Sequence, residues 1–245
     1  MIWNGGGCHF GQTLDVSEAT SIVRAYNENY GMPIRFTFTN PMIRQEHLYD
    51  SYCNTIVKAC ENGFNEILTS SPLLEDYLKT NYPGYRYMKS IIATEQGNDF
   101  SELKDGKYDL IVLKRINNND WSYLDTIPTE YRSKIEILCN DTCPPNCPRL
   151  YTHYQEYGIA QITYNRNFVK PCSFNKNIFS LKELQTNPTF ISRDMIVKDY
   201  YPKGFINFKI SGRANKLVFV ENINNYYIKP EYHADVRNLL LQKYL

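Results

Sequence analysis

The chain has 245 residues, enough to bury a sizeable core, and its 27 basic and 26 acidic residues give a formal net charge of +1. Such a balanced and well-mixed charge creates no field that by itself favours nucleic acid or a membrane surface. No run approaches the ~20 apolar residues of a membrane span, and no basic segment followed by an apolar one opens the chain, so we expect a cytoplasmic protein.

Short β-prone runs alternate along the chain with amphipathic stretches of helical period. The β-prone runs are Ile2–Asn4, Ile34–Thr39, Glu66–Thr69, Arg86–Ile91, Asp109–Leu113, Lys134–Leu138, Thr189–Ile191 and Ile206–Ile210. The main helix candidates are Ser17–Asn29, Gln45–Glu61, Pro72–Asn81, Trp121–Ile127, Arg149–Tyr157 and Ala234–Leu245, with Ser17, Ser71 and Asp120 at N-cap positions. Eight alternations predict an α/β fold, a closed (β/α)8 TIM-like barrel that spans residues 1–245 as a single domain. A doubly wound sheet is the alternative.

Polar residues collect just after the predicted strands, for example Asn40, Lys114-Arg115 and Ser211. In a barrel these positions share one end, which is the catalytic end of the fold, so the loops after Leu138 and Ile210 should lie together. The longest gap between strands follows Leu138, and we expect a long insertion at about 139–188 there to carry function.

Three cysteines open this insertion at C-x3-C-x3-C spacing: Cys139, Cys143 and Cys147. Prolines at 144, 145 and 148 stiffen the loop, and converging thiolates suit a soft metal or an iron–sulfur cluster. An odd total of seven cysteines argues for reduced thiols over a disulfide framework. The alternative is a turn with buried, idle cysteines, because free cysteine often behaves as a small core hydrophobe.

Other residues offer further ligands and charges. His153 follows Cys147 by six positions, so a Cys3His zinc site is a chemically reasonable alternative to a cluster. Arg213 and Lys209 can bind an anionic substrate, although Lys209 can instead pair with a carboxylate inside the fold. Cys53 and Cys60 lie on one face of a predicted helix and are expected in the core, while Cys8 stays ambiguous.

Two segments resemble the peptidase family U-32, a collagenase-like group. They run from Tyr108–Leu113 through Ile135–Cys139, and from Phe190–Asp194 through Gly204–Arg213. Arg35–Pro41 and Asn65–Ser71 look like the second and third barrel strands of that family. The resemblance implies a TIM-like barrel with a 4Fe-4S cluster held by four cysteines. The family includes members associated with oxygen-independent hydroxylation of RNA bases or quinone precursors.

By position in the family pattern, Cys139, Cys143 and Cys147 match the cluster loop, and Cys172 is the best fourth ligand. The chain departs from the pattern in two ways: Ser211 stands where the family has a glutamate, and the first cysteine pair is more widely spaced. We also expect the protein to lack the domain that many members carry after the barrel. Substrate identity therefore does not transfer.

The sequence thus predicts an iron–sulfur barrel enzyme that performs oxygen-independent hydroxylation, or related redox chemistry, on a nucleobase or small aromatic ring. Arg213, Lys209 and Asn40 would orient an anionic co-substrate. A peptidase-like hydrolase is the first alternative, and a zinc- or cluster-stabilised binding module without catalysis is the second. We expect a small-molecule or RNA substrate and no membrane, and a partner subunit that completes the site is left open.

Overall fold

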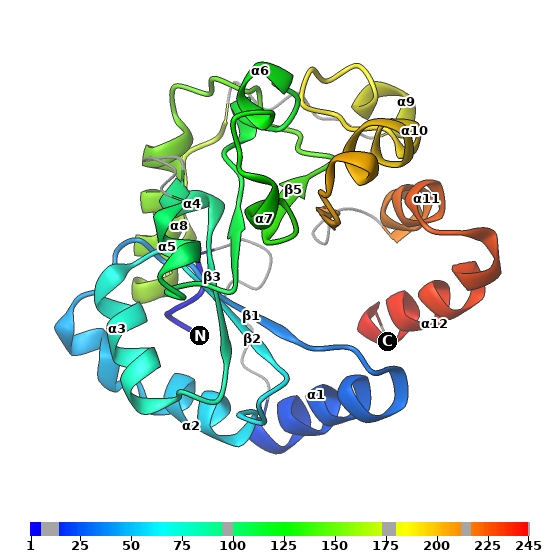
Figure 1. The fold of residues 1–245 in the computed structure, drawn as a ribbon. Coiled ribbons are helices and arrows are strands. Elements are labelled where there is room, and N and C mark those ends of the chain that lie inside the picture. The colour runs from blue at the N-terminus through cyan, green and yellow to red at the C-terminus, as the bar shows by residue number, and fades with distance from the viewer. Residues whose placement is uncertain (6–14, 95–99, 173–179, 212–216, 245) are drawn as a thin grey trace. The chain divides into compact units, whose positions relative to one another are not determined.

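The computed structural model describes residues 1–5, 15–94, 100–172, 180–211 and 217–244 (Figure 1). These residues form two compact units, each made of two chain segments. The first unit comprises Met1–Lys114 and Pro148–Pro171, and the second comprises Arg115–Cys147 and Cys172–Leu245. This division into compact units does not decide whether the chain is a single domain, which stays a prediction.

All strand pairings within the two units are parallel. The first unit contains β1 (Arg35–Phe38), β2 (Glu66–Thr69), β3 (Arg86–Lys89) and β4 (Leu110–Val112). These four pair in chain order, with Phe36 opposite Ile67 and Met88 opposite Leu110. The second unit contains β5 (Ile135–Leu138) and β6 (Asn207–Lys209), which pair with Ile137 opposite Phe208.

Helices fill most of the segments between the strands. The first unit has α1 (Val16–Tyr30), α2 (Ser51–Ala59), α3 (Pro72–Asn81), α4 (Ile91–Thr94), α5 (Ser101–Lys104) and α8 (Leu150–Thr163), with 3-10 turns η2 (Gln45–Tyr49) and η4 (Arg166–Phe168). The second has α6 (Trp121–Leu124), α7 (Thr129–Arg132), α9 (Leu181–Leu184), α10 (Arg193–Met195), α11 (Leu217–Tyr227) and α12 (His233–Tyr244). Short turns η3 (Arg115–Asn117), η5 (Ile196–Tyr200), η6 (Tyr201–Lys203) and η7 (Pro230–Tyr232) complete it. Figure 1 shows α2 and α3 on the same side of β1–β3.

Capping residues fix where several helices begin. Ser71 accepts a hydrogen bond from Leu74 N–H and Asp120 accepts from Ser122 N–H, as the N-cap predictions require. The cap of α1 is Asp15 instead of Ser17, because the Asp15 carboxylate accepts both the Ser17 and Glu18 N–H groups. The predicted helix over residues 45–61 is interrupted at Asp50, which ends η2 and caps α2.

The prediction of a closed (β/α)8 barrel is wrong. The described residues contain six strands, four paired in parallel in the first unit and two in the second, where a closed barrel of this kind needs eight. Two predicted strands, Ile2–Asn4 and Thr189–Ile191, do not form. Each makes a backbone hydrogen bond just beyond the end of a strand: Asn40 N–H, after β1, donates to Trp3 O at 3.1 Å, and Ile191 N–H donates to the carbonyl of Cys139, after β5, at 2.9 Å. Ile2–Asn4 and Thr189–Ile191 therefore lie beside strands without building a ladder of their own.

The strands of the first unit supply its apolar core. Leu68, Met88, Leu110 and Val112 form one buried cluster, and every residue of β2 and β4 is buried. Strands covered on both faces read as continuous apolar runs, which is why these segments could be identified from sequence. None of the helices in the described part of the chain is long and apolar enough to cross a bilayer.

A buried carboxylate, Glu75, ties α3 to its neighbours in the first unit. It accepts hydrogen bonds from the Thr69 hydroxyl at 3.1 Å, from the Lys79 ammonium at 2.9 Å and from the Tyr108 hydroxyl. Lys79 also lies 4.5 Å from the centre of the Tyr108 ring. A buried charge with three donors is stabilising only while its donors remain.

Replacing Glu75 with leucine should lower the free energy of unfolding by about 3 kcal/mol, because the Tyr108 hydroxyl and the Lys79 ammonium lose their acceptor. Chemical denaturation monitored by circular dichroism measures this change. The matched control is Asp76→Leu, an exposed carboxylate on the same helix, which should stay within about 0.5 kcal/mol of the wild type. Equal losses in the two variants would contradict the role of Glu75.

Candidate functional site

The site is built on the carboxyl end of β5 in the second unit, where Cys139 extends the pairing of the strand. Its N–H donates to Lys209 O at 3.0 Å, and its carbonyl accepts from Ile191 N–H at 2.9 Å and from the Tyr227 hydroxyl at 3.4 Å. The thiol is fully buried and lies 3.7 Å from Ile137 O. Cys139 is therefore held in the sheet from both sides.

The next residue, Asn140, joins the end of β5 to the end of β6. Its amide nitrogen donates to Ser211 O at 2.8 Å, its amide oxygen accepts from Ser211 N–H at 2.7 Å, and its carbonyl accepts from the Ser211 hydroxyl at 3.2 Å. The Asn140 side chain thus makes the two hydrogen bonds, one donated and one accepted, that a residue of a paired strand would make with Ser211. The prediction that the loops after Leu138 and Ile210 lie together is confirmed by these bonds.

Asp141 fixes the start of the cysteine loop. Its carboxylate forms a buried ion pair with Arg115 and accepts a hydrogen bond from Cys143 N–H at 3.0 Å. The two charged side chains are only 6% and 9% exposed. The carbonyl of Asp141 accepts from the Asn187 amide at 2.8 Å, so the loop is also tied to the segment after α9.

Cys143, Cys147 and Cys172 are partly exposed free thiols in this unit. Burial raises the pKa of the Cys143 thiol to about 12, with the Asp141 carboxylate raising it further and the Arg115 charge opposing it. The thiols of Cys147 and Cys172 also contribute to raising this pKa. We refer to the three residues together as the thiol cluster of the second unit.

The Cys139 thiol has a different environment. Burial raises its pKa to about 12, and the Glu136 carboxylate adds to the shift. Its charge in turn contributes to raising the pKa of the Tyr200 and Tyr227 hydroxyls, after their own burial. Of these two tyrosines of the second unit, Tyr200 is buried and Tyr227 is partly buried.

Within the ranges that the structure describes, no three side chains of histidine, cysteine, aspartate or glutamate converge closely enough to hold a metal ion. Thiols are soft donors whose chemistry suits a cluster or zinc, and Cys143, Cys147 and Cys172 are partly exposed while Cys139 is buried. The ligand set Cys139, Cys143, Cys147 and Cys172 stays a prediction, as does the choice between an iron–sulfur cluster and zinc.

Asn40 and Lys209, which the sequence predicts to bind substrate, both contact other groups of the protein. Asn40 is fully buried, and its side chain donates to Ile2 O and Gly158 O and accepts from Met42 N–H, so it ties backbone segments of the first unit together. Lys209 lies 3.6 Å from the Glu136 carboxylate, as the ion-pair interpretation expects. Substrate binding by either residue stays a prediction.

Arg213 and His153 are two further candidates. Arg213 lies outside the described residues, as does Cys8. His153 belongs to α8 of the first unit, where its ring packs 4.8 Å from that of Tyr157, and its role as a fourth ligand stays a prediction. Cys53 and Cys60 are buried in the first unit, as expected for core residues.

Sequence reasoning missed the two charges that organise the loop, Arg115 and Asp141. The sequence pattern places Arg115 only among the polar residues that follow the predicted strands. The available signal was the placement of Asp141 two residues before Cys143, because an aspartate side chain commonly accepts the N–H group two positions on.

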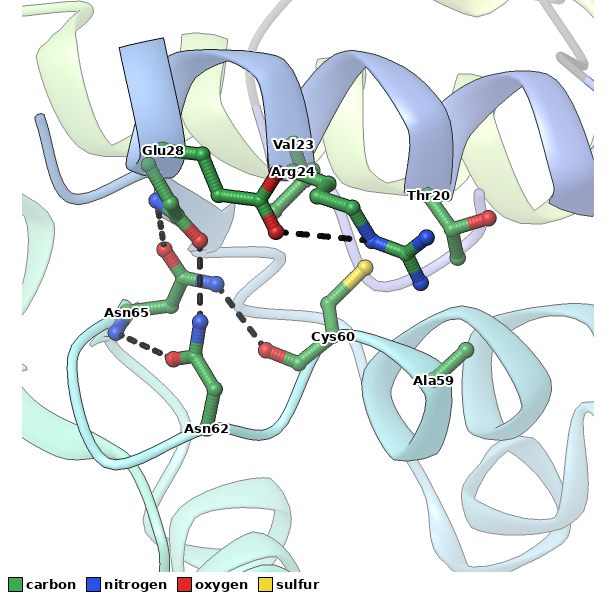
Figure 2. A pocket seen from close by; sticks show the side chains of 9 residues that line it. Thr20, Val23, Arg24, Glu28, Ala59, Cys60, Asn62 and Asn65 are labelled. Carbon is green, nitrogen blue, oxygen red and sulfur yellow. Dashed lines mark hydrogen bonds and ion pairs between the residues drawn. The ribbon is translucent and has the colours of Figure 1, made fainter. Parts of the chain in front are cut away.

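A cavity of about 260 Å³ lies in the first unit between α1 and the segment that follows α2 (Figure 2). Asn27, Asn62 and Asn65 form much of its lining, and they bind one another at 2.9–3.0 Å. Asn65 further accepts from Ile34 N–H and donates to Cys60 O. These amides link α1 to the segment before β2, so we interpret the cavity as a structural feature and not as a ligand site.

Comparison with known proteins yields one relative. A protein of Methanocaldococcus jannaschii named uncharacterized protease MJ1657 is 28% identical to the chain over 196 residues, covering 78% of this chain and 57% of the relative. The chain therefore spans little more than half of that protein's length. No protein-family model and no solved structure matches the chain. A protease name is consistent with the resemblance to peptidase family U-32, without establishing the family.

Replacing Asn140 with alanine should lower the free energy of unfolding by about 2 kcal/mol, because the backbone of the partly buried Ser211 loses one hydrogen-bond donor and one acceptor. Thermal and chemical unfolding measure the loss. Asn146→Ala is the matched control, since Asn146 is exposed in the same loop and should change stability by less than about 0.5 kcal/mol. An unchanged Asn140→Ala protein would show that the link between β5 and β6 does not depend on this side chain.

Proposed function

We propose that the protein is a metal-dependent enzyme whose centre is bound by the thiol cluster of the second unit. The observation that carries this proposal is the presence in one unit of three partly exposed free thiols, Cys143, Cys147 and Cys172, the first two of which lie in the loop that follows the carboxyl end of β5. Cysteine thiolates select soft metals and iron–sulfur clusters. In open parallel sheets, ligands bind outside the carboxyl ends of the strands.

The preferred group is an iron–sulfur cluster, and the preferred reaction is oxygen-independent hydroxylation, or related redox chemistry, of a nucleobase or small aromatic ring. Such a cluster supplies electron transfer or a Lewis-acidic iron when it is bound. The chain's own residues provide the frame: Asp141 holds the Cys143 backbone, and Asn140 holds the end of β6 beside it. Zinc at the same thiols is the alternative, either in a catalytic site or in a binding module without catalysis.

A peptidase-like hydrolase is the second candidate, and the name of the Methanocaldococcus jannaschii relative favours it. A metal held by thiolates can activate water for hydrolysis as well as take part in redox chemistry. The two candidates therefore share the thiol cluster and differ in the metal and the reaction.

Anaerobic purification followed by iron, zinc and acid-labile sulfide analysis tests the proposal. We expect a brown protein with iron and sulfide in equal amounts, and loss of both in Cys143→Ala, because the loop then lacks a ligand. Cys60→Ala is the matched control: it removes a buried thiol of the first unit and should retain the metal. A folded wild type that binds neither iron nor zinc would contradict the proposal.

The hydrolase candidate has its own result. Peptide hydrolysis that depends on stoichiometric zinc, and that disappears in Cys143→Ala, would replace the redox reaction by hydrolysis at the same site. Hydrolysis that persists in Cys143→Ala would place the activity elsewhere and contradict a role for the thiol cluster.

A further inference from the structure

We infer that residues 164–170, which end α8 and follow it, form a binding surface for single-stranded nucleic acid. In this surface Tyr164 and Phe168 stack on bases, and Arg166 and Lys170 contact phosphates. We call residues 164–170 the aromatic–basic segment. The inference goes beyond the proposed function, because the segment belongs to the first unit and its binding needs no metal.

Aromatic and basic residues alternate along the aromatic–basic segment. Tyr164, Arg166, Phe168 and Lys170 occupy every second position, and the segment contains no aspartate or glutamate. Tyr164 is 53% exposed and Phe168 is 44% exposed, and both basic residues are exposed as well. The segment therefore presents two aromatic rings and two positive charges to solvent, without a negative charge of its own.

Hydrogen bonds hold the backbone of this segment in place while its side chains stay exposed. The Asn165 side chain accepts from Asn167 N–H at 3.0 Å near the start of the segment. At its end, the Glu156 carboxylate accepts from Lys170 N–H at 3.1 Å and is itself bound by Arg149 at 2.9 Å. A surface that is fixed before it binds loses little conformational entropy on binding.

The backbone of Tyr164 indicates a role for this residue beyond folding. It ends α8 in the left-handed conformation, with φ 51° and ψ 32°, where helices usually have glycine or asparagine. Among the non-glycine residues that the structure describes, only Tyr164 has a positive φ. This conformation is unfavourable for a residue with a Cβ, and burial of the ring does not compensate for it because the residue is half exposed.

Single-stranded nucleic acid is the partner that this chemistry fits. Its bases are free to stack on aromatic rings, and its phosphates attract the basic side chains beside those rings. Bases inside a duplex are already stacked and cannot reach the rings in this way. A protein partner fits less well, because lysine is depleted in protein interfaces.

Fluorescence anisotropy of a labelled oligo-uridine of about ten nucleotides, titrated with the full chain, tests this inference. We expect a dissociation constant of about 1–100 µM at physiological salt, the range of binding that does not depend on sequence. Phe168→Ala should weaken binding at least about fivefold, because one base loses its stacking partner. Lys170→Gln should reduce the slope of log affinity against log salt concentration by about 0.7, the value for one phosphate contact on a single strand.

Tyr164→Gly separates binding from folding. It should raise the melting temperature, because glycine adopts a positive φ without strain, and it should weaken oligo-uridine binding at least about fivefold. A purely structural role for the ring predicts the reverse, a lower melting temperature with unchanged binding. The matched controls are Phe64→Ala, an exposed aromatic residue before β2, and Lys104→Gln at the end of α5, which should both bind as the wild type does.

Several results would overturn the inference. They are a wild type that does not bind oligo-uridine, full binding by Tyr164→Gly and Phe168→Ala, and tighter binding to a duplex of the same length. Binding to vesicles of phosphatidylcholine and phosphatidylserine in place of the oligonucleotide would also overturn it and assign the surface to a membrane. Oligo-deoxythymidine should bind with similar affinity, because stacking and phosphate contacts do not involve the sugar.

Metal analysis of the same sample separates this inference from the proposed function. A protein without metal that binds oligo-uridine would contradict the proposed function alone. A protein that contains the metal and does not bind oligo-uridine would contradict the nucleic-acid surface alone.

Discussion

The geometry of the thiol loop depends on the buried ion pair between Arg115 and Asp141. Removing two charges from water is costly, and that cost is offset only where each charge keeps its partner and its hydrogen bonds. Asp141 uses one carboxylate oxygen for Arg115 and the other for Cys143 N–H, so the same residue neutralises a buried cation and sets the direction of the loop. The position of the Cys143 thiol follows from this arrangement, because it lies two residues beyond the anchored carboxylate.

Asparagine and tyrosine side chains complete the sheet where the strands of the second unit end. The Asn118 amide donates to Leu138 O at 2.9 Å, and the Tyr200 hydroxyl donates to Asn118 O at 2.6 Å. Tyr227 donates to Ile191 O at 2.8 Å in the same way. With Asn140, these side chains satisfy backbone groups that a longer ladder would otherwise pair. They allow a short two-stranded ladder to present its carboxyl end to a loop.

The elements that could be predicted are those with strong local signals. Glu66–Thr69 and Pro72–Asn81 have the predicted bounds, because an apolar run is followed by an N-cap serine and a proline in the first turn of the helix. Ile2–Asn4 has the composition of a strand, but whether it pairs depends on distant backbone groups that no local pattern encodes. The cysteine spacing likewise predicts that Cys139, Cys143 and Cys147 act together. It does not predict that the Cys139 backbone is bonded to Lys209 and Ile191, because these contacts join residues far apart in the sequence.

The proposed function depends on the binding of a metal by the thiols of this loop. X-ray absorption spectroscopy of the zinc-loaded protein tests it most directly, because the scattering at the Zn–S distance of ~2.3 Å counts the sulfur ligands. The account predicts sulfur ligands to zinc at this distance. A shell made only of oxygen and nitrogen would contradict it.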